Sequence, residues 1–76
     1  MMLLATQTLE LLFAQLGLDN DELSMKRFIS QHKLDAGVLL FEAPFWNNSQ
    51  AMFLKESIYE DADWAEVIDH LDAMLR

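Results

Sequence analysis

The stretch that most constrains the fold is the C-terminal segment of residues 63–76, which places large apolar side chains at helical spacing. Its apolar positions are Trp64, Val67, Ile68, Leu71, Met74 and Leu75. On a helix these positions form one stripe about 120° wide, and acidic or small residues cover the remaining surface. Such a helix has to bury its stripe, so the first half of the chain is predicted to supply the cover.

Two helices are predicted in the first half of the chain from their end signals. The first is expected to begin at Thr6 or Thr8 and to end at Gly17, because glycine readily adopts the left-handed conformation found after helix ends. The second is predicted to begin at Asp19, where Glu22 stands three residues later as the other half of a capping box. Both carry apolar residues at the spacing that is typical of one buried helix face.

The second half predicts two more helices and a short connecting segment. Asn47 with Gln50, and Asp63 with Glu66, each combine an N-cap residue with a side chain that caps it in return. Residues 34–42 are predicted to form an extended or single-turn segment whose side chains reach the core. We therefore predict an all-α fold of four short helices arranged as two helical hairpins, in a small single domain of residues 1–76.

Three ring-bearing side chains are predicted to pack inside the protein. Phe45 and Trp46 precede the third predicted helix as two adjacent aromatic anchors, and Trp46 is also expected to reach an interface. His32 lies at the end of an apolar helical face. Its ring is predicted to pack while one nitrogen bonds a free helix-end carbonyl, and the alternative role is a pH sensor or a general base.

Negative charge is concentrated toward the C-terminus. The net charge is −8, and seven of the 13 acidic residues lie in residues 56–76, where Arg76 is the only base. An acidic surface repels phosphates and anionic lipids, which argues against nucleic acids and membranes as direct partners. The alternative interpretation of the acidic run is that it mimics a nucleic acid and binds a basic protein.

The composition also bears on where the protein resides. The chain contains no cysteine, which excludes disulfide bonds, thiol catalysis and thiolate metal sites. Residues 1–8 lack the basic start and continuous apolar run of a signal peptide. No apolar run approaches the ~20 residues that a transmembrane helix needs. We therefore expect a cytoplasmic protein.

Two side-chain patterns resemble functional sites without completing one. Glu66 and His70 are four residues apart on the last predicted helix and could share a metal ion. Asp63 and Asp69 could add oxygen ligands to it. Nothing fixes a further ligand, and a surface pair of this kind is an ordinary helix feature. Asp61 and Asp63 would need a cleft to act as acid and base, whereas an exposed turn is predicted there. No catalytic, cofactor-binding or metal-binding residues are therefore predicted.

Four segments together resemble a known family. They are Leu12-Phe13-x-Gln15-Leu16-Gly17-Leu18, Ala43-Pro44-Phe45-Trp46, Gln50-x-x-Phe53-Leu54 and Glu60-Asp61-Ala62-Asp63-Trp64-Ala65-Glu66-Val67. With them the chain is similar, over nearly its whole length, to a family of short proteobacterial proteins, Domain of Unknown Function 2789. The resemblance implies a small all-helical fold and supplies no catalytic or ligand-binding residues. Asn47-Asn48 stands where family members often carry Ser/Thr-Pro, and asparagine still caps a helix.

The chain has more apolar residues than one small core can bury. Hydrophobic residues make up 53% of it, against roughly 45–50% in average domains, and small domains bury a smaller share of their surface. We therefore predict a non-enzymatic protein-interaction module that acts as a homodimer, with an unidentified protein as a further candidate partner. Candidate interface residues are Met52, Phe53, Tyr59, Trp46 and Leu11. The alternatives are a small-ligand or metal-binding protein or enzyme with a site between helices, and the acidic nucleic-acid mimic.

Overall fold

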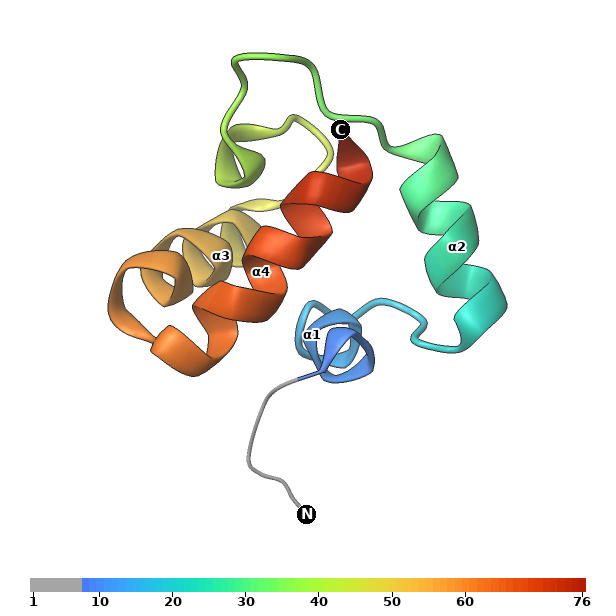
Figure 1. The fold of residues 1–76 in the computed structure, drawn as a ribbon, viewed down its shortest axis with the longest axis horizontal. Helices are drawn as coiled ribbons and strands as arrows, with labels where there is room; N and C mark the ends of the chain where they lie inside the picture. Colours follow the sequence, from blue (N-terminus) through green and yellow to red (C-terminus); the bar gives the residue numbers. More distant parts are fainter. Residues whose placement is uncertain (1–7) are drawn as a thin grey trace.

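The computed structural model describes residues 8–76, which form four α-helices and one short 3₁₀ turn (Figure 1). The elements are α1 (Leu9–Gln15), α2 (Glu22–Gln31), η1 (Leu40–Glu42), α3 (Asn48–Glu60) and α4 (Ala62–Leu75). The described residues contain no strand, and the predicted all-α class is confirmed. The segment between α2 and α3 contains one helical turn, η1, as predicted.

Helix α4 lies at the centre of the structure, where it contacts each of the other three α-helices. Helices α3 and α4 lie side by side as an antiparallel hairpin, whereas α1 and α2 point in different directions and each pack against α4 (Figure 1). The arrangement therefore shows one clear hairpin at the C-terminal end, and the first two helices cover α4 individually.

The core forms around the apolar stripe of α4. The largest fully buried side chains are Phe13, Leu12, Leu54, Ile68, Leu71 and Leu75. Three of these belong to α4, two come from α1 and one from α3, so the first half of the chain supplies part of the predicted cover and α3 supplies the rest. Trp64, in the first turn of α4, is only partly buried, and its ring packs edge-on against Phe53 at 5.5 Å between ring centres.

Helix α1 begins and ends where the sequence predicts. The Thr8 side chain accepts a hydrogen bond from the N–H of Leu11 at 3.2 Å, whereas Thr6, the other predicted start, lies outside the described residues. At the other end Gly17 has φ 76°, and the N–H of Leu18 reaches the carbonyl of Phe13 at 2.9 Å. This is the backbone pattern of a helix closed by glycine, and it turns the chain sharply before α2.

Helix α2 begins two residues later than predicted. Its N-cap is Asp21, not Asp19, and the Asp21 side chain accepts a hydrogen bond from the N–H of Ser24 at 3.0 Å. Hydrogen bonding by the side chain and then the backbone of Ser24 holds the pKa of Asp21 below its usual value. The intervening Asn20 is used differently, because its side chain donates to the carbonyl of Glu10 at 3.2 Å and links the loop to α1.

Helix α4 is capped by Asp61 and not by Asp63, so the predicted Asp63–Glu66 capping box is wrong. Helix α3 continues to Glu60, which leaves Asp61 as the single residue between the two helices. The Asp61 side chain accepts hydrogen bonds from the N–H groups of Asp63 at 3.1 Å and Trp64 at 3.4 Å. The backbone of Asp61 is extended, at φ −134° and ψ 100°, and is therefore not helical. This one residue ends α3 and reverses the direction of the chain before α4.

Asp61→Ala is expected to lower the free energy of unfolding by about 0.5–2 kcal/mol, because it removes the N-cap of α4. Asp61→Asn should retain most of the stability, since asparagine caps as well as aspartate. Denaturant unfolding followed by circular dichroism measures all the variants. A larger loss for Asp63→Ala than for Asp61→Ala would contradict this cap assignment.

Helix α3 starts with the capping box that the sequence predicts. The Asn47 side chain accepts from the N–H of Gln50 at 2.8 Å, and the Gln50 side-chain oxygen accepts from the N–H of Asn47 at 2.9 Å. The Gln50 amide nitrogen also donates to the carbonyl of Leu16 at 2.8 Å. This hydrogen bond joins the start of α3 to the end of α1, because the Leu16 carbonyl is one of those at a helix end that lack a partner within the helix.

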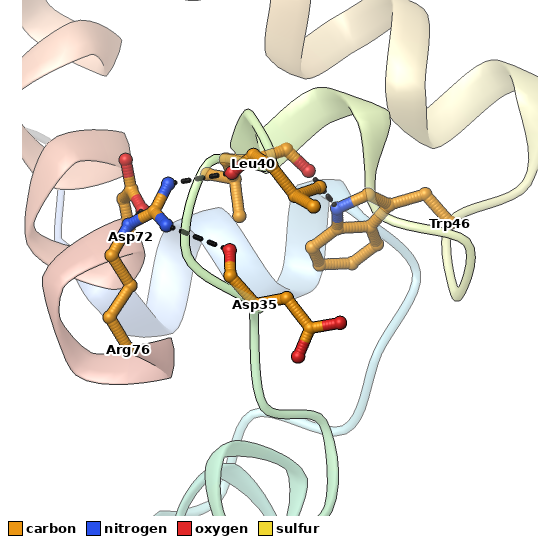
Figure 2. A network of polar contacts seen from close by, with 6 residues as sticks. Asp35, Leu40, Trp46, Asp72 and Arg76 are labelled. Carbon is orange, nitrogen blue, oxygen red and sulfur yellow. Dashed lines mark hydrogen bonds and ion pairs between the residues drawn. The ribbon is translucent and has the colours of Figure 1, made fainter.

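Arg76 connects the end of α4 to the loop that precedes η1 (Figure 2). Its Nε donates to Asp72 at 2.7 Å, and its Nη1 and Nη2 donate to the carbonyls of Asp35 at 3.2 Å and Val38 at 2.7 Å. A guanidinium group is suited to this role because it holds several donors in one plane. Two loop carbonyls and one carboxylate therefore meet at a single side chain.

Candidate functional site

His32 lies in an aromatic cluster and has a structural role. Its ring stacks on Phe28 at 4.0 Å between ring centres and meets Phe45 at 5.0 Å. Its Nδ1 lies 2.9 Å from the carbonyl of Phe28, one turn back in α2. The predicted packed histidine with a bond to a helix-end carbonyl is confirmed.

Trp46 was predicted to reach an interface, but its side chain lies in the core. It is 9% exposed, and its ring stacks on Phe28 at 5.7 Å between ring centres. Its Nε1 donates to the carbonyl of Leu40 at 2.8 Å (Figure 2). Because its ring is covered and its donor is used, Trp46 offers a partner almost no surface.

The carboxylates considered for catalysis or metal binding lie on the surface. Glu66 and His70 are both exposed on α4, as is Asp69. Within residues 8–76, no group of three or more His, Asp or Glu side chains is arranged to hold a metal ion. Asp61 and Asp63 are exposed at the turn between α3 and α4, and Asp61 is engaged as an N-cap. Asp61 and Asp63 therefore belong to a solvated acidic turn, and Glu66, Asp69 and His70 lie on the solvent-exposed side of α4.

The candidate site is the outer surface of α3, where two large apolar side chains face solvent. Met52 is 59% exposed and Tyr59 is 70% exposed. They are seven residues apart, which places them on one line along the helix. We use the term outer face of α3 for the residues that line a surface hollow of about 240 Å³ there, namely Met52, Lys55, Glu56, Tyr59 and Glu60.

The packing of α3 explains why this face is left uncovered. Leu54 is buried against the core, and Ala51 and Ile58, on the same side of the helix, are partly buried. Met52 lies about 160° around the helix from Leu54, since each residue turns by about 100°. One side of α3 therefore contacts α4 and η1, whereas Met52 on the opposite side faces solvent.

The rim of the outer face of α3 extends onto other elements. On one side Phe41 of η1 meets the ring of Tyr59 at 6.2 Å between centres, and Lys55 Nζ lies 5.9 Å from the centre of the Phe41 ring. On the other side Phe53 is partly buried beside Trp64. Apolar surface thus continues across three elements of the chain.

The predicted interface residues do not all lie together. Met52 and Tyr59 form the centre of the candidate site. Phe53, next to Met52 in the chain, is partly buried and lines a different hollow. Leu11 is 50% exposed, but it belongs to α1, which packs against α4. Sequence patterns missed Lys55, Glu56 and Phe41; the seven-residue spacing of Met52 and Tyr59 was the available signal, because it indicates which neighbours share their face.

Two other hollows lie elsewhere on the described surface. One of about 210 Å³ lies between α1 and α2 and includes Phe28 and Arg27. The other, of about 340 Å³, lies where the Gln50 side chain bonds the end of α1. Ligand pockets typically enclose about 300–1,000 Å³ and contain a few convergent polar groups. In residues 8–76, no buried side-chain nitrogen or oxygen lacks a hydrogen-bond partner, so neither hollow contains an unused buried polar group.

Comparisons with known proteins bear on the family and not on the activity. None of the helices in the described part of the chain has the length and apolarity to cross a membrane. No curated protein and no solved structure matches the sequence significantly. A family model described as protein of unknown function (DUF2789) matches residues 2–75. This match spans the helices, the aromatic cluster and the outer face of α3, and the chain therefore belongs to that family.

Proposed function

We propose that this protein is a non-enzymatic protein-interaction module that acts as a homodimer through the outer face of α3. Met52 and Tyr59 carry this proposal, because both are more than half exposed on one line of a helix whose other side is packed. Solvent exposure of two large apolar side chains in one place is typical of a contact surface. Methionine and tyrosine are also enriched at the centre of protein interfaces.

The size of the chain supports association with a second copy. A domain of 76 residues forms a small core, and domains of this size often gain stability by oligomerisation. A stable interface buries at least about 1,000 Å² in total. Helix α3 is about 20 Å long at 1.5 Å per residue, and Phe41 widens the apolar surface beside it. The outer face of α3 and its rim thus offer a surface of the right kind for a two-fold contact.

The charge of the protein fits the rest of the proposal. The net charge of −8 disfavours direct binding to nucleic acids or anionic membranes. The absence of cysteine suits a reducing compartment, which supports a cytoplasmic location. The acidic turn of residues 60–63 is expected to stay solvated in the dimer, since like charges repel when they are brought together. Glu60 is the exception, because it belongs to α3 and lines the outer face of that helix.

Sedimentation equilibrium at micromolar concentration tests the proposal. The wild-type chain is expected to sediment as a dimer of an 8.8 kDa subunit, and Met52→Ser with Tyr59→Ser is expected to yield a folded monomer. Leu23→Ser is the matched control, because Leu23 is 65% exposed on α2 and lies away from this face. A wild-type protein that is folded, soluble and monomeric would refute the homodimer, and Met52 and Tyr59 would then be scattered surface residues.

A further inference from the structure

The two sides of the outer face of α3 carry opposite charges. Met52 and Tyr59 define its central line, and adjacent residues are about 100° apart around a helix, so Lys55 and Glu56 lie about 50° to either side of that line. Glu60 lies on the same side as Glu56. All three charged side chains are exposed. The single ion pair within residues 8–76 joins Arg76 to Asp72, so none of these three side chains has an ion-pair partner among the described residues, and Lys55 Nζ lies only over the Phe41 ring.

A two-fold axis can relate two copies of α3 in two ways, and the charges distinguish them. If the two helices are antiparallel, the two-fold axis passes between them at right angles to both. The lysine side of one copy then faces the lysine side of the other, and the glutamate sides face each other. Lys55 then lies near the partner subunit's Lys55, and the glutamates lie near the partner's glutamates. If the two helices are parallel, the two-fold axis runs between them in the same direction as the helices. The lysine side of one copy then faces the glutamate side of the other, as in parallel coiled coils.

We infer that the second copy docks with its α3 parallel to that of the first, with Lys55 facing the partner subunit's Glu56 and Glu60. This inference rests on the proposed homodimer and adds its orientation. Met52 then meets the partner's Met52, and Tyr59 meets the partner's Tyr59, along the axis. The apolar centre supplies most of the affinity, and the charged sides select the orientation because like-charge contacts are unfavourable.

Disulfide cross-linking tests the orientation directly. The natural chain has no cysteine, so Met52→Cys and Tyr59→Cys each introduce a single thiol. A disulfide needs Cα atoms within about 7 Å, and parallel helices bring both pairs of identical positions together. Under mild oxidation, each variant alone is therefore expected to form a covalent dimer. In an antiparallel pair at most one of them can do so, because positions 52 and 59 are about 10 Å apart along the helix.

Charge reversal supplies a second, independent measurement. Lys55→Glu is expected to weaken dimerisation at least about tenfold, because each copy would then present glutamates against glutamates. Reversing Glu56 and Glu60 to lysine in the same chain should restore the wild-type dissociation constant. Lys26→Glu is the matched control, since Lys26 is exposed on α2 and the substitution changes the net charge equally. An antiparallel pair would respond little to Lys55→Glu, because it only exchanges one like-charge contact for another.

The outcomes separate this inference from the proposed function. Self-cross-linking at both positions, together with weakening by Lys55→Glu, supports the parallel dimer. A dimer that depends on Met52 and Tyr59 but cross-links only in a mixture of the two cysteine variants would overturn the orientation and leave the interaction module intact. A wild-type monomer would overturn both.

Discussion

Trp46→Ala is expected to lower the free energy of unfolding by about 3–5 kcal/mol, which is the usual effect of removing a large aromatic side chain from a core. Trp46 is 9% exposed and packs against Phe28 of α2 and the adjacent Phe45. It also bonds Leu40 of η1 through its indole nitrogen. A domain this small rarely has more than about 3–5 kcal/mol of net stability, so the variant should be largely unfolded in water at 25 °C.

Trp46→Phe separates the two contributions of this side chain. Phenylalanine retains much of the ring packing and removes one of two donors to the carbonyl of Leu40, which still accepts from the N–H of Ala43 at 3.1 Å. The loss of this one hydrogen bond should cost about 0.5–1.5 kcal/mol. Far-ultraviolet circular dichroism and urea unfolding measure both variants at a fixed protein concentration, because the stability of the proposed dimer would depend on concentration. If the alanine variant lost less than about 1 kcal/mol, as is common for surface substitutions, Trp46 would not be a core anchor.

Leu71→Ala is expected to lower the free energy of unfolding by about 2–5 kcal/mol. Leu71 is 0% exposed in α4, the helix that contacts α1, α2 and α3. A cavity there removes contacts at the centre of the core, and the neighbouring elements close it only partly. Urea unfolding at fixed concentration measures the effect.

Two controls show whether burial explains the effect of Leu71→Ala. Leu23→Ala makes the same chemical change at a site that is 65% exposed, and it should change stability by less than about 0.5 kcal/mol. Ile68→Val, at a fully buried neighbour, removes one methylene group and should cost about 0.5–1.5 kcal/mol. Equal losses for Leu71→Ala and Leu23→Ala would place Leu71 outside the core.

Helix ends show how far local chemistry can be read from a sequence. The capping box at Asn47 and the glycine end of α1 were both predicted, because in each case one residue had the required side chain or backbone freedom. The N-caps of α2 and α4 were misplaced by two residues each, since aspartates stand at both the predicted and the observed positions. When two aspartates could each cap the same helix, the one that does so is decided by where the preceding element ends and how that element packs.

The candidate site was predicted in part. Met52 and Tyr59 were identified because a helix that buries Leu54 has to expose them. Trp46 was misplaced on the surface in one of its two predicted roles, and Phe41 was missed. The positions of Trp46 and Phe41 both depend on η1. The carbonyl of Leu40 accepts a hydrogen bond from the Trp46 indole, and the Phe41 ring lies against Tyr59. Short irregular segments have no periodicity from which their side-chain directions can be predicted.

The sequence by itself determined the helical class, the buried stripe of α4 and the exposed line on α3, because these follow from side-chain spacing within one helix. Only the tertiary structure decided which aspartates cap, where Trp46 lies, and how Arg76 bonds the loop at Asp35 and Val38, which are 41 and 38 residues away. Spacing along a chain predicts which residues share a face of their own helix. It does not predict which distant carbonyl or ring will meet that face, since that depends on the joint packing of all the elements.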